Sequence, residues 1–279
     1  MFKKIAIAGL GFIGGSISIA LKSKYPDVEL VGITRDISKV KSSKNSELID
    51  VITDYSNLES LKNSDLVVIC SNVSYIPKVF DSLKIFLSPS CVVTDVGSVK
   101  KFVVENINNP SFVGSHPMTG SDKSGFENAD PSIFEGSLCV ITPYNNEDHI
   151  VKIVSEFWKF LGMSTLIISP ENHDKIVSQT SHFIHLVSYV LSYTLSKSDF
   201  AKEKFLGIFS KGLLDTTRVS KSDPELWVDI ISRNKENVLS ILDIFIKDVE
   251  KFKGYIERDE VDNLKNMFEF ARDFRKSLD

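Results

Sequence analysis

The sequence has little cysteine and contains no motif that pairs its cysteines. Cys70, Cys91 and Cys139 are an odd number with wide spacing, and they form no Cys-x-x-Cys or Cys/His zinc pattern. We therefore expect three reduced and mostly buried thiols, as in a cytosolic protein, and not a disulfide scaffold.

The sequence also lacks a strong excess of charge of either sign. It has 33 Lys and Arg against 37 Asp and Glu, a formal net charge of -4. This balance argues against a general nucleic-acid binder, which carries a strongly basic face. An anionic ligand must therefore be held by a few local groups. The length of 279 residues and the hydrophobic fraction of 42% are typical of a globular protein with roughly two domains.

One long run without charge stands near the N-terminus, from Ile5 to Leu21, directly after two lysines. Such a run can be a signal peptide or a membrane span. Here four glycines interrupt it, and its pattern divides into a buried strand, KIAIAG, and a helix, FIGGSISIALKSK. No other stretch is apolar enough to cross a bilayer. We expect a cytoplasmic protein with no membrane contact.

The glycines of this run form the pattern Gly9-x-Gly11-x-x-Gly14 between the strand and the helix. This arrangement is the dinucleotide-binding fingerprint. Gly9 permits the tight turn, Gly11 lets the backbone approach the pyrophosphate, and Gly14 lets the helix lie close to the strand. The helix N-terminus then presents free N–H groups to the phosphates. The alternative is a glycine-rich packing turn. We expect the cofactor to contact Gly9, Gly11, Phe12, Ile13, Gly14 and Ser71.

The second predicted strand ends in Gly32-Ile33-Thr34-Arg35-Asp36. An NAD-binding domain usually has an acidic residue here, about 20 residues after the glycines, to bind the ribose hydroxyls. Thr34 occupies that position and Arg35 follows, a pair that can bind a 2′-phosphate. The cofactor is therefore NAD or NADP, and the pair favours NADP. Asp36 reaches the ribose only if the strand ends later.

The first half of the chain alternates short apolar runs with helical patterns. The runs span residues 28–33, 65–70, 91–96, 111–115, 137–143 and 164–169, and the helical patterns lie near 38–48, 75–87, 98–108 and 147–161. This alternation predicts a mainly parallel sheet covered on both faces. We expect an α/β fold with a Rossmann-type, doubly wound domain over residues 1–169. Its cofactor cleft lies at the carboxyl ends of the strands.

The pattern changes after residue 169, where Pro170 and Glu171 open a long helical run. Further helical patterns follow near residues 200–213, 224–252 and 257–277, and no strand pattern occurs. Ser222-Asp223-Pro224 is a typical helix start. Residues 170–279 are therefore expected to form an all-helical domain. The stretch 176–195 is apolar on more than one face, as in a core or a subunit interface.

Polar residues gather in three clusters. The segment Asp95-Val-Gly-Ser98-Val-Lys100 follows one strand, and GSHPMTGSDKSG, residues 114–125 with His116, follows the next. Both are expected at the carboxyl edge of the sheet. The third cluster lies in the helical half and contains Ser178, Ser181, His182 and His185, then Asp215-Thr-Thr-Arg218. We interpret His173-Asp174 at the start of the long helix as a capping or hinge feature.

These clusters make the sequence resemble the prephenate/arogenate dehydrogenase family. The resemblance rests on DVGSVK, GSHPMTGSDKSG, the SH-x-x-H helix, and DTTR followed by SDPELW, and it spans Gly9 to Trp227 and beyond. It implies an N-terminal dinucleotide domain and a helical C-terminal dimerisation domain that makes a homodimer. It also implies oxidation and decarboxylation of prephenate or arogenate, with hydride transfer to NAD(P), on the route to tyrosine.

The resemblance assigns roles to single residues. His116 matches the catalytic histidine, and Ser98 matches a serine that contacts both this histidine and the substrate hydroxyl. Ser178 and His182 match residues near the substrate, and Arg218 matches the arginine that binds a substrate carboxylate. Three positions depart from the family pattern: Asp122 stands where many members have Glu, Thr34 where NAD-using members have Asp, and Leu214 where many have Arg.

The implied chemistry agrees with these residue types. As hydride leaves the carbon that bears the hydroxyl, a base must accept the hydroxyl proton, and a neutral imidazole suits that task. Arg218 can hold a carboxylate through two parallel hydrogen bonds. We expect Arg218, Lys100 and a helix N-terminus to attract the anionic substrate locally. No metal is expected, because hydride transfer needs none.

Two other functions fit parts of the sequence. A β-hydroxyacid dehydrogenase has the same two-domain plan but uses a catalytic lysine on the inter-domain helix, where this chain has only Lys175 near the helix start. A non-catalytic dinucleotide-binding sensor would keep the glycines without needing His116, Ser98 and Arg218 together. Their joint presence favours the enzyme.

Overall fold

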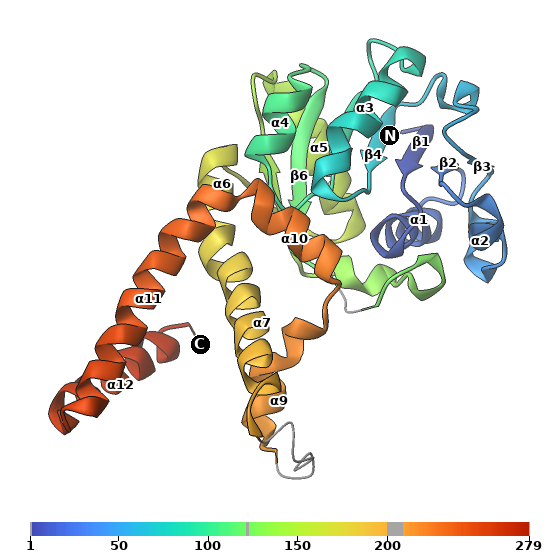
Figure 1. Ribbon diagram of the computed structural model, residues 1–279. Helices are drawn as coiled ribbons and strands as arrows, with labels where there is room; N and C mark the ends of the chain where they lie inside the picture. Colours follow the sequence, from blue (N-terminus) through green and yellow to red (C-terminus); the bar gives the residue numbers. More distant parts are fainter. Residues whose placement is uncertain (1, 121–122, 200–208, 279) are drawn as a thin grey trace. The chain divides into compact units, whose positions relative to one another are not determined.

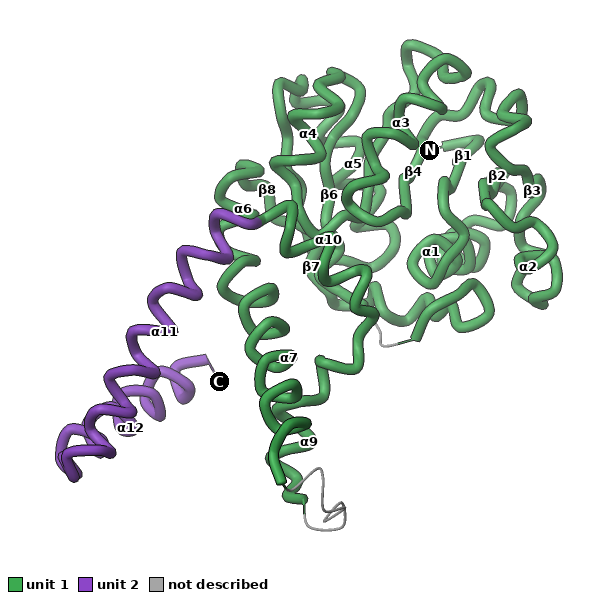
Figure 2. The backbone as a smooth tube through the Cα atoms, viewed as in Figure 1, with its two compact units in different colours: residues 1–234 green, residues 235–279 purple. Residues whose placement is uncertain are grey.

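The computed structural model describes residues 2–120, 123–199 and 209–278. The chain forms two compact units, residues 1–234 and residues 235–279 (Figure 2). The second unit holds helices α11 (Lys235–Glu257) and α12 (Val261–Lys276), whose contact includes stacked Phe252 and Phe268. The domain boundary expected at 169/170 falls inside the first unit and stays a prediction.

The first unit is built on one eight-stranded sheet of order β3-β2-β1-β4-β5-β6-β7-β8. Every neighbouring pair is parallel except β6 and β7, so the predicted doubly wound, mainly parallel fold is confirmed. Among the described strands, β3 alone was not predicted, because its three residues are too few to show a pattern. The strands are β1 (Lys4–Ala8), β2 (Glu29–Ile33), β3 (Val51–Thr53), β4 (Leu66–Ile69), β5 (Val92–Asp95), β6 (Phe112–Pro117), β7 (Leu138–Thr142) and β8 (Ser164–Ile167).

Helices cover both faces of this sheet (Figure 1). Ile5 and Ile7 of β1 pack in the core with α1 (Phe12–Lys24) and α5 (Asp148–Leu161). Ala6 and Ala8 point to the opposite face, because side chains alternate along a strand. There they pack with α3 (Ile76–Leu83), α4 (Lys101–Ile107) and α10 (Pro224–Arg233).

Two predicted helices are shorter than the sequence suggested. The pattern at 38–48 is divided into α2 (Ile37–Lys41) and a 3₁₀ turn (Lys44–Leu48). The pattern at 224–252 is broken at Asn234, between α10 and α11. The expected start at Asp223 is confirmed, since its carboxylate accepts a hydrogen bond from the Glu225 N–H at 2.9 Å.

The long helical run after residue 169 also divides. It consists of α6 (Pro170–Val177), a π-helical turn (Ser178–His182) and α7 (Phe183–Ser196). Helix α9 (Lys211–Thr217) and a 3₁₀ turn (Arg218–Lys221) follow, and α7 packs against both. Most of the pattern at 200–213 lies outside the described residues. No described helix has the length and apolar character to cross a membrane.

Candidate active site

The glycine turn lies between β1 and α1 and has the shape that a dinucleotide needs. Gly9 has φ +114°, and a Cβ there would lie 2.2 Å from the Cys70 carbonyl oxygen. A Cβ on Gly14 would lie 2.1 Å from the Gly9 carbonyl oxygen. In contrast, a Cβ on Gly11 would meet no described atom within 4 Å. Gly9 and Gly14 are therefore required by packing, whereas Gly11 leaves open space for a ligand.

The start of α1 offers backbone donors to such a ligand. Gly11 is the N-cap and supplies no side-chain cap, and the first helical hydrogen bond runs from the Gly15 N–H to the Gly11 carbonyl at 2.9 Å. The N–H groups of Phe12, Ile13 and Gly14 therefore lack helical partners. Donors at the positive end of a helix dipole suit a pyrophosphate. The turn fits a dinucleotide.

The end of β2 carries no free carboxylate. The Asp36 side chain caps α2 and accepts a hydrogen bond from the Lys39 N–H at 2.9 Å. Thr34 and the exposed Arg35 precede it, and the Thr34 hydroxyl accepts from the Asp36 N–H at 3.2 Å. Ser71 follows Cys70, whose carbonyl touches the Gly9 turn, so it lies at the same edge. These residues can form the adenosine side of a cofactor site.

His116 lies near the carboxyl end of β6 and is joined to two residues of α6. Its Nδ1 is 2.9 Å from Nε2 of His173, and Nδ1 of His173 is 2.7 Å from Oδ1 of Asp174. The Asp174 carboxylate also accepts from the backbone N–H groups of Lys100 at 2.7 Å and Lys101 at 3.0 Å. These contacts form a continuous hydrogen-bonded series from α4 to His116.

This series corrects the interpretation of His173-Asp174 as a feature of its own helix start. Ser169 caps α6, since its hydroxyl accepts from the Asn172 N–H at 3.2 Å. Asp174 instead caps α4, more than seventy residues earlier in the chain. Only the histidine-rich composition near 173–185 signalled that His173 belongs to the site.

A buried ion pair stabilises the loop between β5 and α4. Lys100 and Asp95 are both fully buried and pair directly, and Lys100 Nζ also donates to the Ser115 carbonyl at 2.8 Å. Asp95 accepts in turn from the N–H groups of Gly97 at 2.8 Å and Ser115 at 3.0 Å. Lys100 is therefore occupied within the protein, so the expectation that it attracts the substrate is wrong. Its task is to hold the strand end that carries His116.

The π-helical turn brings His182 to the same side as His173. Residues nine apart in an α-helix point in opposite directions, at about 100° per residue. A π turn contains one extra residue, so it reduces the rotation about the helix axis between the two side chains by about 100°. Both histidines are buried, and Asn234 joins His182 to the residue after His173: its Nδ2 donates to the Asp174 carbonyl at 2.7 Å and lies 3.1 Å from His182 Nδ1.

The surroundings keep these imidazoles neutral. Burial lowers the pKa of His116 well below 6.5, and nearby His173, Lys100 and His182 lower it further. Burial also lowers the pKa of His173, against the opposing effect of Asp174. For His182, burial lowers the pKa to about 4. A neutral His116 can accept a proton at neutral pH.

Two predicted site residues make fewer contacts than expected. Ser98 follows β5 and its backbone faces the His182 ring, but among the described residues no hydrogen bond joins its hydroxyl to His116. The buried Ser178 hydroxyl donates to the Lys175 carbonyl at 2.8 Å within its own helix. Their substrate contacts stay predictions. Asp122 lies outside the described residues.

Arg218 stands at the far end of this cluster. It begins the turn after α9, is exposed, and lies close enough to His185 to lower the pKa of that imidazole. The His185 ring stacks on Trp227 with a centroid distance of 3.5 Å, and Trp227 meets His182 edge-on at 6.2 Å. The contacts thus run from His116 to Arg218. The motif SDPELW contained Trp227, but its stacking partner was not predictable.

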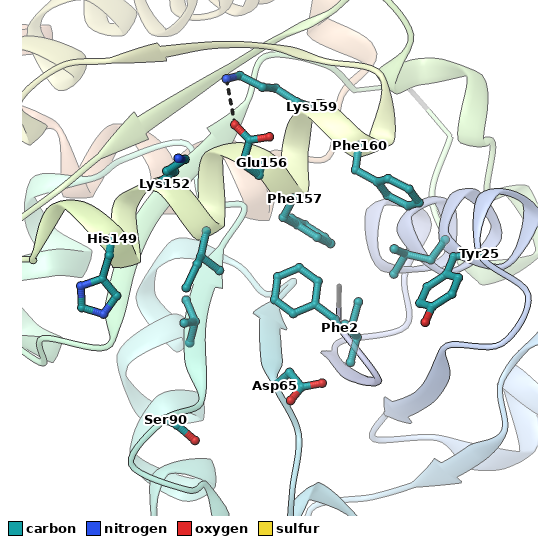
Figure 3. Close-up of a pocket in the computed structure, with 14 residues that line it drawn as sticks. Phe2, Tyr25, Asp65, Ser90, His149, Lys152, Glu156, Phe157, Lys159 and Phe160 are labelled. Carbon is teal, nitrogen blue, oxygen red and sulfur yellow. Dashed lines mark hydrogen bonds and ion pairs between the residues drawn. The ribbon is translucent and has the colours of Figure 1, made fainter.

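A large groove lies elsewhere on the first unit. It has a volume of about 1020 Å³ and is lined by Phe2, Asp65 and Ser90, which precede β1, β4 and β5, and by residues of α5 (Figure 3). It therefore lies at the amino edge of the sheet and contains none of the predicted site residues. The candidate active site is the polar cluster at the carboxyl edge.

Two family models match the chain in succession. "Prephenate dehydrogenase, nucleotide-binding domain" matches residues 17–166, and "Prephenate dehydrogenase, dimerization domain" matches residues 169–270. A prephenate dehydrogenase of Bacillus subtilis is 32% identical over 98% of this chain and 76% of its own length. A cyclohexadienyl dehydrogenase of Zymomonas mobilis is 29% identical over 100% of this chain and 97% of its own.

A solved structure is similar over the same length. It is the prephenate dehydrogenase of A. aeolicus in complex with hydroxyphenyl propionate and NAD+, with a TM-score of 0.92 and 30% identity. The superposition covers 100% of this chain and 99% of that chain.

Proposed function

Since the chain belongs to the prephenate/arogenate dehydrogenase family and is an NAD(P)-dependent enzyme of that family, we propose which of its residues carry the reaction. The observation that carries the proposal is the buried series that ends on His116 at the carboxyl edge of the sheet. The family match sets aside a β-hydroxyacid dehydrogenase and a non-catalytic sensor.

His116 is the base for the substrate hydroxyl. A bound nicotinamide cofactor supplies the acceptor for the hydride that leaves the hydroxyl-bearing ring carbon. At the same time His116 accepts the hydroxyl proton, so the C–O bond becomes a carbonyl. The bond between the ring and its carboxylate then breaks, carbon dioxide leaves, and the ring becomes aromatic. Ser98 orients the hydroxyl, and Ser178, His182 and Asp122 line the substrate.

The cofactor of this chain is NADP in preference to NAD. The support is the end of β2, where Asp36 is engaged as a helix cap while Thr34 and the exposed Arg35 remain to meet a 2′-phosphate. Gly9, Gly11, Phe12, Ile13, Gly14 and Ser71 hold the rest of the cofactor.

A four-way assay tests the proposed function and the cofactor. Prephenate and arogenate, which differ in a keto-acid or amino-acid side chain, are each supplied with NAD and NADP while reduced cofactor is followed. We expect turnover of at least one substrate and a lower KM for NADP. A clear preference for NAD would refute the role of Thr34 and Arg35, and no turnover in all four mixtures would refute the function.

Arg218 binds a substrate carboxylate in this proposal. Its guanidinium is exposed at the open end of the cluster and is free to make two parallel hydrogen bonds to a carboxylate. We expect Arg218→Ala to raise the KM for the substrate by about tenfold to 100-fold, because the variant loses a hydrogen-bonded charged pair worth about 1.5–3 kcal/mol. Steady-state kinetics measure this, with the exposed Arg275→Ala as control. An unchanged KM would contradict the role.

The protein is a homodimer in this proposal. Residues 169–270 match a dimerization domain, and α7 exposes the apolar side chains of Ile184, Val190 and Tyr193. Apolar side chains left exposed on more than one face of a helix are typical of a subunit interface. Light scattering should give twice the monomer mass of 31.2 kDa. A monomer at micromolar concentration would contradict the interface.

A further inference from the structure

Asp174, His173 and His116 form a series that ends on the proposed base. We propose that Asp174 and His173 are positioning residues that fix the tautomer of His116, with the proton on Nδ1 and the lone pair on Nε2. This inference rests on the proposed role of His116 as the base.

The series has a direction because its first member can only accept. Backbone N–H groups of Lys100 and Lys101 donate to the two oxygens of Asp174, as they would to a carboxylate. The contact of 2.7 Å to Nδ1 of His173 therefore requires a proton on that nitrogen. A neutral imidazole carries only one N–H, so Nε2 of His173 is an acceptor.

The same reasoning then applies to His116. Its Nδ1 lies 2.9 Å from the acceptor Nε2 of His173, so Nδ1 of His116 must be the donor. Nε2 of His116 is left with its lone pair, the form that a base needs. The hydrogen bond of one nitrogen thus sets the state of the other.

This placement of the protons holds only when His173 is neutral. A doubly protonated His173 would point an N–H at His116 and reverse its tautomer. Burial and Lys100 both lower the pKa of His173, although Asp174 raises it. His173 and Asp174 are 1% and 3% exposed, so water does not compete for these hydrogen bonds. When His116 accepts a proton, the series also stabilises the resulting charge, because Asp174 is its nearest fixed anion along the hydrogen bonds.

Nitrogen-15 NMR of the histidine rings tests the tautomer in the whole protein at neutral pH. We expect His116 and His173 both protonated at Nδ1 and unprotonated at Nε2, with signals assigned from His116→Asn and His173→Gln. A proton on Nε2 of His116 would overturn the proposal, whatever the activity of the variants.

Kinetics of three variants provide the second test. Asp174→Asn removes the negative charge at the start of the series and sets an amide N–H against at least one of the donors that the carboxylate now accepts, so kcat should fall on the order of 100-fold with KM for the cofactor unchanged. In His173→Gln the amide can donate to Asp174 and accept from His116, so it should retain more activity than His173→Leu. Equal activity of the Gln and Leu variants would overturn the proposal, as would an unchanged kcat in Asp174→Asn.

The exposed His149→Gln serves as the control and should match the wild type. Failure of this inference is distinct from failure of the proposed function. An active wild type with the opposite tautomer removes only the positioning series, whereas a wild type inactive on both substrates removes the function beneath it.

Discussion

His116→Asn should lower kcat by about two to four orders of magnitude, the usual contribution of a general base. Asn is close in size to His and its amide N–H can still donate to His173, but it cannot take up the hydroxyl proton. Cofactor affinity should stay nearly the same, because the glycine turn at β1 is built from other residues. The loss is therefore expected in turnover and not in cofactor binding.

Cofactor titration and steady-state kinetics separate these two effects. His149→Asn is a matched control, since His149 is exposed on α5 at the opposite edge of the sheet. Turnover that is unchanged in His116→Asn would remove His116 from the mechanism. Weaker cofactor binding with equal loss of turnover would instead indicate a disturbed fold.

Lys100→Met should destabilise the protein by about 3–5 kcal/mol, the cost of leaving one partner of a buried ion pair without the other. Lys100 and Asp95 have no exposed side-chain surface, so water cannot replace the lost partner. Asp95 would keep the N–H groups of Gly97 and Ser115 but would lose the ammonium group of Lys100. We expect the free energy of unfolding to fall by this amount.

Urea unfolding followed by fluorescence measures this loss. The double variant Asp95→Asn, Lys100→Met removes both charges, so its cost should be well below the sum of the two single variants. The exposed pair of Lys159 and Glu156 is the comparison, because Lys159→Met should change stability by at most about 1 kcal/mol. Additive single and double variants would contradict the role of the pair.

The sheet was predictable because its signals are local. Each buried strand is a short apolar run, and the glycines of the turn form a short pattern within one β-α unit, where a Cβ on Gly14 would meet the Gly9 carbonyl. The position of His116 at the carboxyl edge follows from the same pattern. The antiparallel pairing of β6 with β7 has no such signal, because it depends on how the chain crosses the sheet.

The contacts between side chains that lie far apart in the sequence were not predictable. His116 and His173 are 57 residues apart, and Asp174 caps a helix that begins 73 residues earlier. The π turn that aligns His182 with His173 looks like ordinary helix in the sequence. Lys100 shows most clearly what the sequence could not predict. A lysine beside a predicted cleft suggests an anion-binding site, but Lys100 is buried against Asp95 and has a structural role.

The most direct test of this account uses prephenate and arogenate, each labelled with carbon-14 in the ring carboxylate, and follows the one that the enzyme oxidises. Labelled carbon dioxide and reduced NADP are counted together in wild type and in His116→Asn. We predict one carbon dioxide for each reduced cofactor in the wild type, and the loss of both products in parallel in the variant. Carbon dioxide without cofactor reduction, reduced cofactor without carbon dioxide, or a variant as active as the wild type would contradict it.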